Sequence, residues 1–517
     1  MSMSFFQKTT IKNALMAILS GVLLGAAAAA FMPGAYATSF LVSALLLSAA
    51  TFILIVTWRW AGGQKGLAAM MAAAFLVRMV VGIGMSAALP AYGYDNEQQK
   101  AGYLFTDAYR RDNEAWGLRL NQGSLWQVMR SEFDTDQYGG LLVVSGMVYR
   151  GISPDAHRPQ LIVMLGAFLT ALGLPFFWRA SRGLFSEKIS RAAGWIYALY
   201  PDAILYGSSQ LREPFMIGLF AVAFWAVSEW KTGDRWRRLL AFGLSAAGML
   251  VISSRIALMV LLALMVWFWV VNTSPRQKKL GWLGWAAISA ASLVLAGLFW
   301  VWMRESLAWD MTLAMQNSGW VAKLIEGQPR VFQMGFITVY GLLRPLLPAA
   351  IADPSNPIWK TIAITRAAGW YVLAPFLLYS PIALMRKLDR GERRRMLVMV
   401  LTLLLWIVIS SLRAGGDDWD NPRYRIAFMP WLALAAPWAL AKAREARDAW
   451  LARLIAVEMV FLLFFTNWYF SRYFNWFGRL PFWTMIAWIV GLSGLIVVGG
   501  IVWDSRAWLA RKFQKSK

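Results

Sequence analysis

The chain contains repeated apolar runs of a length that crosses a bilayer, and this feature restricts its fold more than any other. Runs such as LVSALLLSAATFILIV and LIVMLGAFLTALGLPFFW are apolar on every face. A hydrocarbon core of about 30 Å takes about 20 such residues as a helix. The strands of a membrane barrel alternate apolar and polar residues, and these runs do not, so a closed barrel is excluded. The sequence therefore predicts an all-α polytopic integral membrane protein.

The basic residues report topology. Lys and Arg number 51 against 27 Asp and Glu, and they collect in short clusters directly after apolar runs, as in residues 179–191, 231–238 and 386–395. Such clusters mark cytoplasmic loops by the positive-inside rule. The net charge of +24 is therefore explained by the membrane, and no nucleic-acid partner is predicted. The chain has no cysteine, which excludes disulfides and thiolate sites.

Applied along the chain, this rule predicts about 14 membrane-spanning helices, with 13 to 15 compatible with the pattern. The expected spans begin near residues 13, 38, 67, 159, 192, 214, 239, 256, 280, 369, 395, 426, 454 and 483. Short runs between residues 192 and 272 leave room for spans to merge or break. An even count returns the basic C-terminus to the cytoplasm. We expect residues 1–517 to form a single transmembrane domain.

Two long segments, residues 90–157 and 304–368, are expected on the extracytoplasmic face and are expected to carry interfacial helices. The first holds nine of the 27 acidic residues. These are Asp95, Glu97, Asp107, Asp112, Glu114, Glu132, Asp134, Asp136 and Asp155. The sequence thus predicts that the protein keeps many of its carboxylates outside.

Within the first long loop, the stretch YLFTDAYRRDNEAW predicts a short helix. Its apolar positions recur at helical spacing: Phe105, Ala108, Asp112, Ala115 and Trp116. Asp112 therefore falls in the apolar stripe. Asp107 lies elsewhere, four residues before Arg111, a spacing that favours an exposed ion pair. In the simplest interpretation Asp107 is a solvated partner of Arg111 and Asp112 is a cap or a salt-bridge residue.

Residues around this loop carry a family resemblance. The preceding span reads FLVRMVVGIGMSAALP, with Arg78 and Pro90, and the loop reads FTDAYRRDNEAWGL, with Asp107, Ala115 and Leu118. The arrangement resembles the membrane glycosyltransferases of the GT-C superfamily, in particular glycosyltransferase family 39, the dolichyl-phosphate-mannose-protein mannosyltransferases and bacterial aminoarabinose transferases. Those enzymes have an early helix with an Arg and a Pro near its end. A large extracytoplasmic loop follows, with an acid and then a spaced Ala and Leu.

The resemblance continues in DQYGGLLVVSGMVYRGISPDAHRP and in the late PRYRIAFMP, residues 422–430. It covers the first half of the chain and that late motif. Its core helices would be residues 67–272, after two additional spans, with residues 369–517 as C-terminal helices. The family usually has adjacent Asp and Glu where this chain has Asp107 followed by Ala108. Spacing favours Asp107 as the family's acid and the apolar stripe favours Asp112, so both stay candidates.

The resemblance implies an inverting transfer at the extracytoplasmic face of the plasma (inner) membrane. The donor would be a polyprenyl-phosphate-linked sugar, and the acceptor a lipid, a glycan or a protein. A loop Asp, Asp107 or Asp112, would remove the proton of the acceptor hydroxyl as general base. No cofactor is required by any spacing in the chain, although Mg²⁺ or Mn²⁺ held by carboxylates is compatible with it.

The leaving phosphate needs a cation, and the planar fork of Arg suits phosphate oxygens. Four arginines are candidates: Arg423, Arg425, Arg212 and Arg344. For the first two the alternative is ion pairing with acids of the same turn. These acids are Asp417, Asp418 and Asp420.

Three further residues are singled out by type and place. Glu213 follows Arg212 at a helix edge, where it is a candidate substrate contact or else neutralises Arg212 and caps the helix. Arg78 is the one clear mid-span charge, so it should face the bundle and hold an acidic or carbonyl partner, or touch the donor. His157 is the sole histidine and is interpreted as an interfacial residue, and one histidine cannot form a histidine-based metal site.

Two other classes share this general pattern. A surface-polysaccharide polymerase or ligase also has many spans and a large outer loop, but its chemistry is expected on Arg and His of a late loop. A transporter or flippase of lipid-linked sugars is expected to show interrupted, charged helices and repeated halves. This chain shows no repeat and crowds its acids in the early loop, which favours the transferase.

Overall fold

The computed structural model describes residues 2–120, 125, 139–272, 297, 328–417 and 419–515. Every regular element in these ranges is a helix, and ten helices are long and apolar enough to cross a membrane. The prediction of an all-α, multi-pass membrane protein is confirmed. Fourteen spans are not found in the described ranges, and the span expected near residue 280 lies outside them.

The chain divides into two compact units. The first comprises Met1–Trp269 and Ile426–Leu434, and the second Val270–Arg425 and Ala435–Lys517.

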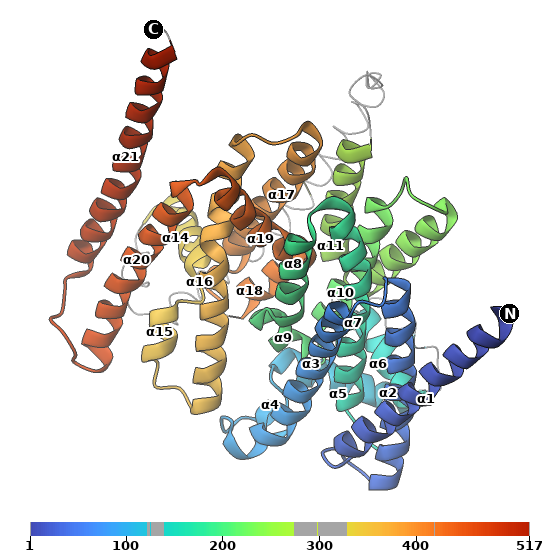
Figure 1. Ribbon diagram of the computed structural model, residues 1–517. Helices are drawn as coiled ribbons and strands as arrows, with labels where there is room; N and C mark the ends of the chain where they lie inside the picture. Colours follow the sequence, from blue (N-terminus) through green and yellow to red (C-terminus); the bar gives the residue numbers. More distant parts are fainter. Residues whose placement is uncertain are drawn as a thin grey trace. The chain divides into compact units, whose positions relative to one another are not determined.

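The long helices of the first unit are α1 (Ser2–Ala29), α2 (Tyr36–Trp60), α3 (Lys65–Tyr92), α7 (Gln160–Leu184) and α11 (Arg235–Asn272). Helices α1 and α2 pack against each other beside the turn that joins them (Figure 1). A Cβ at Gly25 would come within 2.7 Å of the Ala44 backbone. Small residues at such a crossing let two membrane helices approach closely, and this explains why the two helices pair.

Two expected spans of this unit take another form. Helix α8 (Glu187–Leu199) has 13 residues and stops before Pro201, which begins the short α9 (Pro201–Gly207). Helix α10 (Glu213–Ser228) has 16 residues. A proline disfavours helical backbone in the residue before it, which separates α8 from α9. The runs expected to span from residues 192 and 214 are therefore helices shorter than a bilayer needs.

The two spans expected near residues 239 and 256 are joined in α11. This helix has 38 residues, and Ser253 is its one residue with non-helical backbone angles. Ser253 is extended, so two helical segments meet there at a kink, although no Gly or Pro stands beside this position. This break lies close to the expected start of the second run near residue 256, while Arg235–Asn272 as a whole counts as one candidate span by length and composition.

The first long loop, residues 90–157, holds α4 (Glu97–Lys100), α5 (Thr106–Gly117), η1 (Leu118–Leu120) and α6 (Gly139–Gly151). Helix α5 matches the expected short helix, and the stripe positions Ala108, Asp112 and Ala115 are buried. The periodic pattern thus correctly identified both the helix and its inward face.

The helices of the second unit are α14 (Arg330–Leu343), α15 (Leu347–Ala352), α16 (Pro357–Met385), α17 (Arg390–Ala414), α18 (Asp420–Arg425), α20 (Ala449–Tyr473) and α21 (Phe482–Lys515). The short η4 (Ile426–Phe428) belongs to the first unit, and α19 (Met429–Ala446) contains residues of both units. Helices α20 and α21 lie side by side at the red end of the chain (Figure 1). Arg453 and Asp504 join them with N–O distance 2.7 Å.

The second long loop ends earlier than expected. Helix α16 begins at Pro357 rather than near residue 369, because Asn356 caps it and Pro357 occupies its first turn. Both are strong helix-start signals. Polar residues such as Lys360 and Arg366 lower the hydropathy of the first turns, and this placed the expected start too late in the sequence. Of the expected loop 304–368, residues 304–327 lie outside the described ranges.

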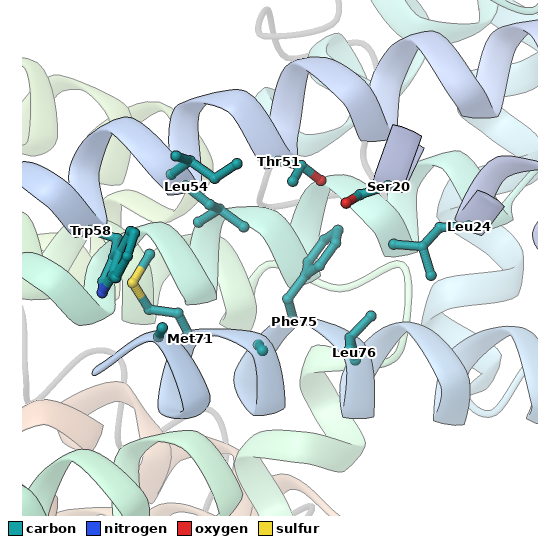
Figure 2. A pocket seen from close by; sticks show the side chains of 11 residues that line it. Ser20, Leu24, Thr51, Leu54, Trp58, Met71, Phe75 and Leu76 are labelled. Atoms are coloured by element: carbon teal, nitrogen blue, oxygen red, sulfur yellow. The ribbon is translucent and has the colours of Figure 1, made fainter. Parts of the chain in front are cut away.

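An apolar cavity of about 310 Å³ lies among α1, α2 and α3. Its lining comprises Ser20, Leu24, Thr51, Leu54, Ile55, Trp58, Ala68, Met71, Ala72, Phe75 and Leu76. Met71 and Phe75 point from α3 toward α2 (Figure 2). Two hydroxyls are its only side-chain polar groups besides the Trp58 indole, so the cavity suits hydrocarbon chains. It offers no charged group for a sugar phosphate.

Candidate functional site

The first long loop buries a carboxylate among hydrogen-bond donors. Asp112 Oδ1 accepts a hydrogen bond from the Tyr149 hydroxyl at 2.6 Å, and Oδ2 accepts one from the Tyr103 hydroxyl at 2.7 Å. His157 Nε2 lies 2.8 Å from the same Oδ2. The Asp112 side chain is only 1% exposed. We refer to Asp112, Tyr103, Tyr149 and His157 as the Asp112 cluster.

Four segments of the loop supply this cluster. Asp112 comes from α5, Tyr103 from the turn before it, Tyr149 from α6, and His157 from the entry to α7. Arg150 also donates to the Leu118 carbonyl at 3.0 Å, which ties the end of α6 to the end of α5. The helical period of α5 turns Asp112 inward, and the other contacts are made by residues up to 45 positions away.

The His157 ring is held on two sides. It stacks on Trp116 with ring centroids 4.9 Å apart and planes 11° apart, and it meets Tyr149 edge-on at 5.0 Å. Its side chain is 21% exposed, in contrast to the enclosed Asp112. The imidazole is thus the part of the Asp112 cluster that solvent reaches most.

Arg158, the residue after His157, is held by several hydrogen bonds. Arg158 is fully buried, and its guanidinium donates to Ser39, Ser153, Thr38 and both oxygens of Asp155 at 2.6–2.9 Å. These bonds join the start of α7 to the start of α2. They also hold the pKa of the Asp155 carboxyl well below its usual range, mainly through the Arg158 hydrogen bond. The backbone that carries His157 is therefore fixed.

Burial and the charge of Asp112 determine the protonation state of the two tyrosines in the Asp112 cluster. Burial first, and then the Asp112 carboxylate, raise the pKa of both Tyr103 and Tyr149 above the usual phenol value. Both phenols are consequently neutral and donate to Asp112. The carboxylate accepts from two phenols and the imidazole, a set of donors that stabilises its negative charge.

Asp107, the other candidate base, has a different environment. Its side chain is 42% exposed and lies 3.6 Å from Arg111 and 3.9 Å from Arg110. The ion pair with Arg111 predicted from the four-residue spacing is confirmed. The structure therefore separates the two candidates: Asp112 is enclosed in a hydrogen-bonded cluster, whereas the Asp107 side chain is 42% exposed and pairs with Arg111, whose side chain is buried.

In the second unit, Arg425 and Arg344 are buried against backbone carbonyls. Arg425 donates to the Arg344 carbonyl at 2.8 Å and to the Gly341 carbonyl, and it lies 4.0 Å from the Trp370 ring centroid. Arg344 donates to the Gly416 carbonyl. Because these carbonyls belong to the last turn of α14 and the segment after α17, the arginines stabilise helix ends, where cations are favourable.

Close backbone packing surrounds these arginines. A Cβ at Gly341 would come within 2.7 Å of Gly415 Cα. Asn421 also donates to the Gly341 carbonyl at 2.8 Å. The α14–α17 crossing therefore requires glycine at this point, and the arginines bond to a carbonyl that this crossing fixes.

Arg423 follows the alternative considered from the sequence. It lies 3.5 Å from Asp420, and its side chain is buried. Asp417 instead accepts from the backbone N–H groups of Trp419 and Asp420 at 2.6 and 3.0 Å, a typical N-terminal cap. Asp418, the third acid considered, lies outside the described residues. The late motif thus combines ion pairing and capping.

Arg212 and Glu213 lie together at the start of α10, in the first unit. Both are buried, and Arg212 Nε lies 3.3 Å from Glu213 Oε1. This contact matches the neutralising role that the sequence offered for Glu213. Pro214 follows in the first turn of the helix, a position that proline favours.

Arg78 has the carbonyl partners expected of a charge inside a membrane helix. It is fully buried and donates to the carbonyls of Ala74 and Ala198 at 2.9 and 2.8 Å. A Cβ at Gly207 would come within 2.7 Å of its Nε. Arg78 therefore completes the C-terminal turn of α8.

The description of Arg78 as the one clear mid-span charge was wrong. Glu458 lies inside α20, and its Oε1 is buried without a hydrogen-bond partner in the described part of the chain. The letters LIAVEMVFLLFF contain the signal that could have revealed it. A carboxyl at this depth is costly and marks a position to test.

The contacts of His157 were missed by the sequence reasoning, which interpreted the residue as interfacial. Tyr103 and Tyr149 were also not singled out. The available signal was that the sole histidine stands at the end of an acid-rich loop, but no local pattern links it to Asp112. Sequence comparisons supply no further guide, because neither a protein-family model nor a curated protein matches this chain.

Proposed function

We propose that the protein is a GT-C-type membrane glycosyltransferase. It transfers a sugar from a polyprenyl-phosphate-linked donor to a hydroxyl of a lipid, glycan or protein, with inversion at the anomeric carbon. The observation that carries the proposal is the buried Asp112 carboxylate, fixed by Tyr103, Tyr149 and His157 in the loop where the sequence resemblance expects the catalytic acid.

The chemistry requires a group that removes the acceptor proton as the new glycosidic bond forms. A side chain in this role must lie in a rigid, hydrogen-bonded setting, and it contributes about 10²- to 10⁴-fold in rate. The Asp112 cluster meets the rigidity requirement through its stacked ring and the anchored Arg158. The Asp107 carboxylate is more exposed, at 42%, and lies 3.6 Å from Arg111. We therefore place the proton transfer at the Asp112 cluster.

The leaving group is a lipid phosphate, and its developing charge needs a cation. Arg425 and Arg344 donate to carbonyls at helix ends, so we assign the phosphate contact to Arg423. Arg423 lies 3.5 Å from Asp420, and a phosphate would compete with that carboxylate. Arg212, Glu213 and Arg78 act in this proposal by fixing α8 and α10.

A divalent cation was compatible with the sequence, but the described residues do not offer it a ligand set. No three His, Cys, Asp or Glu side chains lie together in the described ranges. We derive no step that uses Mg²⁺ or Mn²⁺.

The proposal places the chemistry at the extracytoplasmic face of the plasma membrane, because residues 179–191 and 386–395 carry basic clusters. Single cysteines at Asn96, Ser355 and Gly391 of this cysteine-free chain test the orientation. An impermeant thiol reagent on intact cells should label the first two and spare the third. Labelling of Gly391→Cys alone would reverse the orientation.

The activity itself is tested with purified protein in detergent and a panel of radiolabelled polyprenyl-phosphate sugars. We expect release of polyprenyl phosphate and transfer of label to water or to an added acceptor. A transporter or flippase would instead move intact donor across vesicles without breaking its bond. A polymerase or ligase would use lipid-linked oligosaccharides and leave the monosaccharide donors unchanged. Either outcome would replace the proposal.

A further inference from the structure

The Asp112 cluster combines an enclosed carboxylate, Asp112, with a partly exposed imidazole, His157. Both oxygens of Asp112 already accept hydrogen bonds, three in total, and the side chain is 1% exposed. An acceptor hydroxyl would have to displace one of these donors to reach it. The His157 side chain is 21% exposed. Within the cluster, the imidazole is therefore the group that a substrate can approach.

The hydrogen bond to Asp112 also determines which nitrogen of the His157 ring carries the proton. A carboxylate only accepts hydrogen bonds, so the short contact to Asp112 requires the proton on His157 Nε2. In the neutral ring, Nδ1 then carries the lone pair. Nδ1 makes no hydrogen bond to any residue that the structure describes. The ring thus has one nitrogen bonded to the acid and the other available to take a proton.

We propose that His157 Nδ1 is the general base and that Asp112 positions it, an inference that rests on the proposed transferase activity. As the acceptor oxygen bonds to the anomeric carbon, its proton moves to Nδ1. The bond from that carbon to the donor phosphate breaks, and its electron pair leaves with the lipid phosphate. The imidazolium is stabilised by the Asp112 carboxylate and returns its proton to water. This is the role that an acid beside a catalytic histidine fulfils in hydrolases.

Rigidity supports this assignment. Stacking on Trp116 restricts rotation of the ring, and the five hydrogen bonds of Arg158 fix the adjacent backbone. A base held this way needs little reorientation to reach the transition state, so the free-energy cost of that reorientation is small. The Asp107 side chain, in contrast, is 42% exposed beside Arg110 and Arg111.

The first test needs no activity. His157 is the only histidine among 517 residues, so protein labelled with ¹³C,¹⁵N-histidine gives one imidazole signal in solid-state NMR. At pH 7.5 we expect the tautomer protonated on Nε2, with Nδ1 unprotonated. In Asp112→Asn the amide N–H can donate to Nε2, which favours the opposite tautomer. Protonated Nδ1 in the parent protein would overturn the inference, whatever the protein catalyses.

The second test uses transfer kinetics. His157→Gln keeps an amide that can donate to Asp112 but lacks a base, so kcat should fall about 10²- to 10⁴-fold, with the donor KM within about twofold. In His157→Ala, added imidazole should enter the space beside Trp116 and restore part of the lost rate. Asp95→Asn, in the exposed pair with Lys100 of the same loop, is the matched control and should retain parental kinetics.

The outcomes separate the two proposals. A His157→Gln protein with near-parental kcat would overturn the histidine base while leaving the transferase intact, and Asp112 itself would then be the base. A parent protein that cleaves no polyprenyl-phosphate sugar would overturn the proposed function, while the NMR result still decides the state of the Asp112–His157 pair. Failure of His157→Gln to fold leaves imidazole rescue of His157→Ala and the NMR result to decide.

Discussion

The Asp112 cluster and the arginines around Gly341 both bury charge, but in opposite ways. Asp112 accepts from three side chains, one of which, His157, can itself change protonation and is partly exposed. Arg425 and Arg344 donate to backbone carbonyls that close helix ends. Backbone carbonyls do not exchange protons in this pH range, and they are fixed by the helix that contains them. The comparison teaches that burial alone does not identify a site: the nature and the exposure of the partners do.

The largest expected effect is on catalysis at the Asp112 cluster. Asp112→Asn and His157→Gln should each lower kcat by about 10²-fold or more, and the double variant should be hardly slower than the worse single one. Residues that act as one unit show this lack of additivity. Steady-state rates of the four proteins complete the cycle. Independent, additive losses would show that the two side chains do not act together.

The arginine contacts predict a loss of stability instead. Arg425→Lys keeps the charge but loses the planar fork that bonds the Gly341 and Arg344 carbonyls and stacks on Trp370. The unfolding free energy should fall by about 1–3 kcal/mol, with donor KM unchanged. Thermal unfolding in detergent, with KM measured below the transition, checks this. A KM raised tenfold at unchanged stability would instead give Arg425 the phosphate role predicted from sequence.

The smallest effect concerns Asp155, which binds Arg158 beside His157. Its pKa is lowered in the folded protein, so its stabilising contribution is complete above the unfolded-state pKa of about 3.9. The contribution disappears as pH falls through the lower folded-state pKa. Asp155→Asn should therefore melt below the parent at pH 7, and the difference should shrink in acid. Because Asp155 is 46% exposed, we expect a shift of a few degrees at most, and a pH-independent shift would contradict this linkage.

Local patterns in the sequence predicted what depends on neighbours along the chain. Helical spacing located α5 and turned Asp112 inward, and the four-residue spacing located the Asp107–Arg111 pair. Long apolar runs identified α2, α3 and α7 as spans. The two runs expected from residues 239 and 256 correspond to the two parts of α11, which meet at the kink at Ser253.

The site could be predicted only in part, because its contacts are distant in sequence. His157 and Asp112 are 45 residues apart, and nothing in either segment specifies the other. The role of the arginines was equally hidden. The sequence does not distinguish a buried Arg that binds a phosphate from one that binds a helix-end carbonyl. Every residue has a backbone carbonyl, so the sequence does not show which carbonyl accepts the hydrogen bond.

The central claim is that the chemistry belongs to the enclosed Asp112 and its histidine rather than to the exposed Asp107. Single-turnover transfer by Asp112→Asn and Asp107→Asn, measured side by side with a polyprenyl-phosphate sugar, tests it most directly. We predict a loss of about 10²-fold or more for Asp112→Asn. For Asp107→Asn we predict less than about fivefold, because this carboxylate is 42% exposed and lies 3.6 Å from Arg111, and such a pair contributes about 0–1 kcal/mol. The reverse order, or near-parental rates in both proteins, would contradict the account.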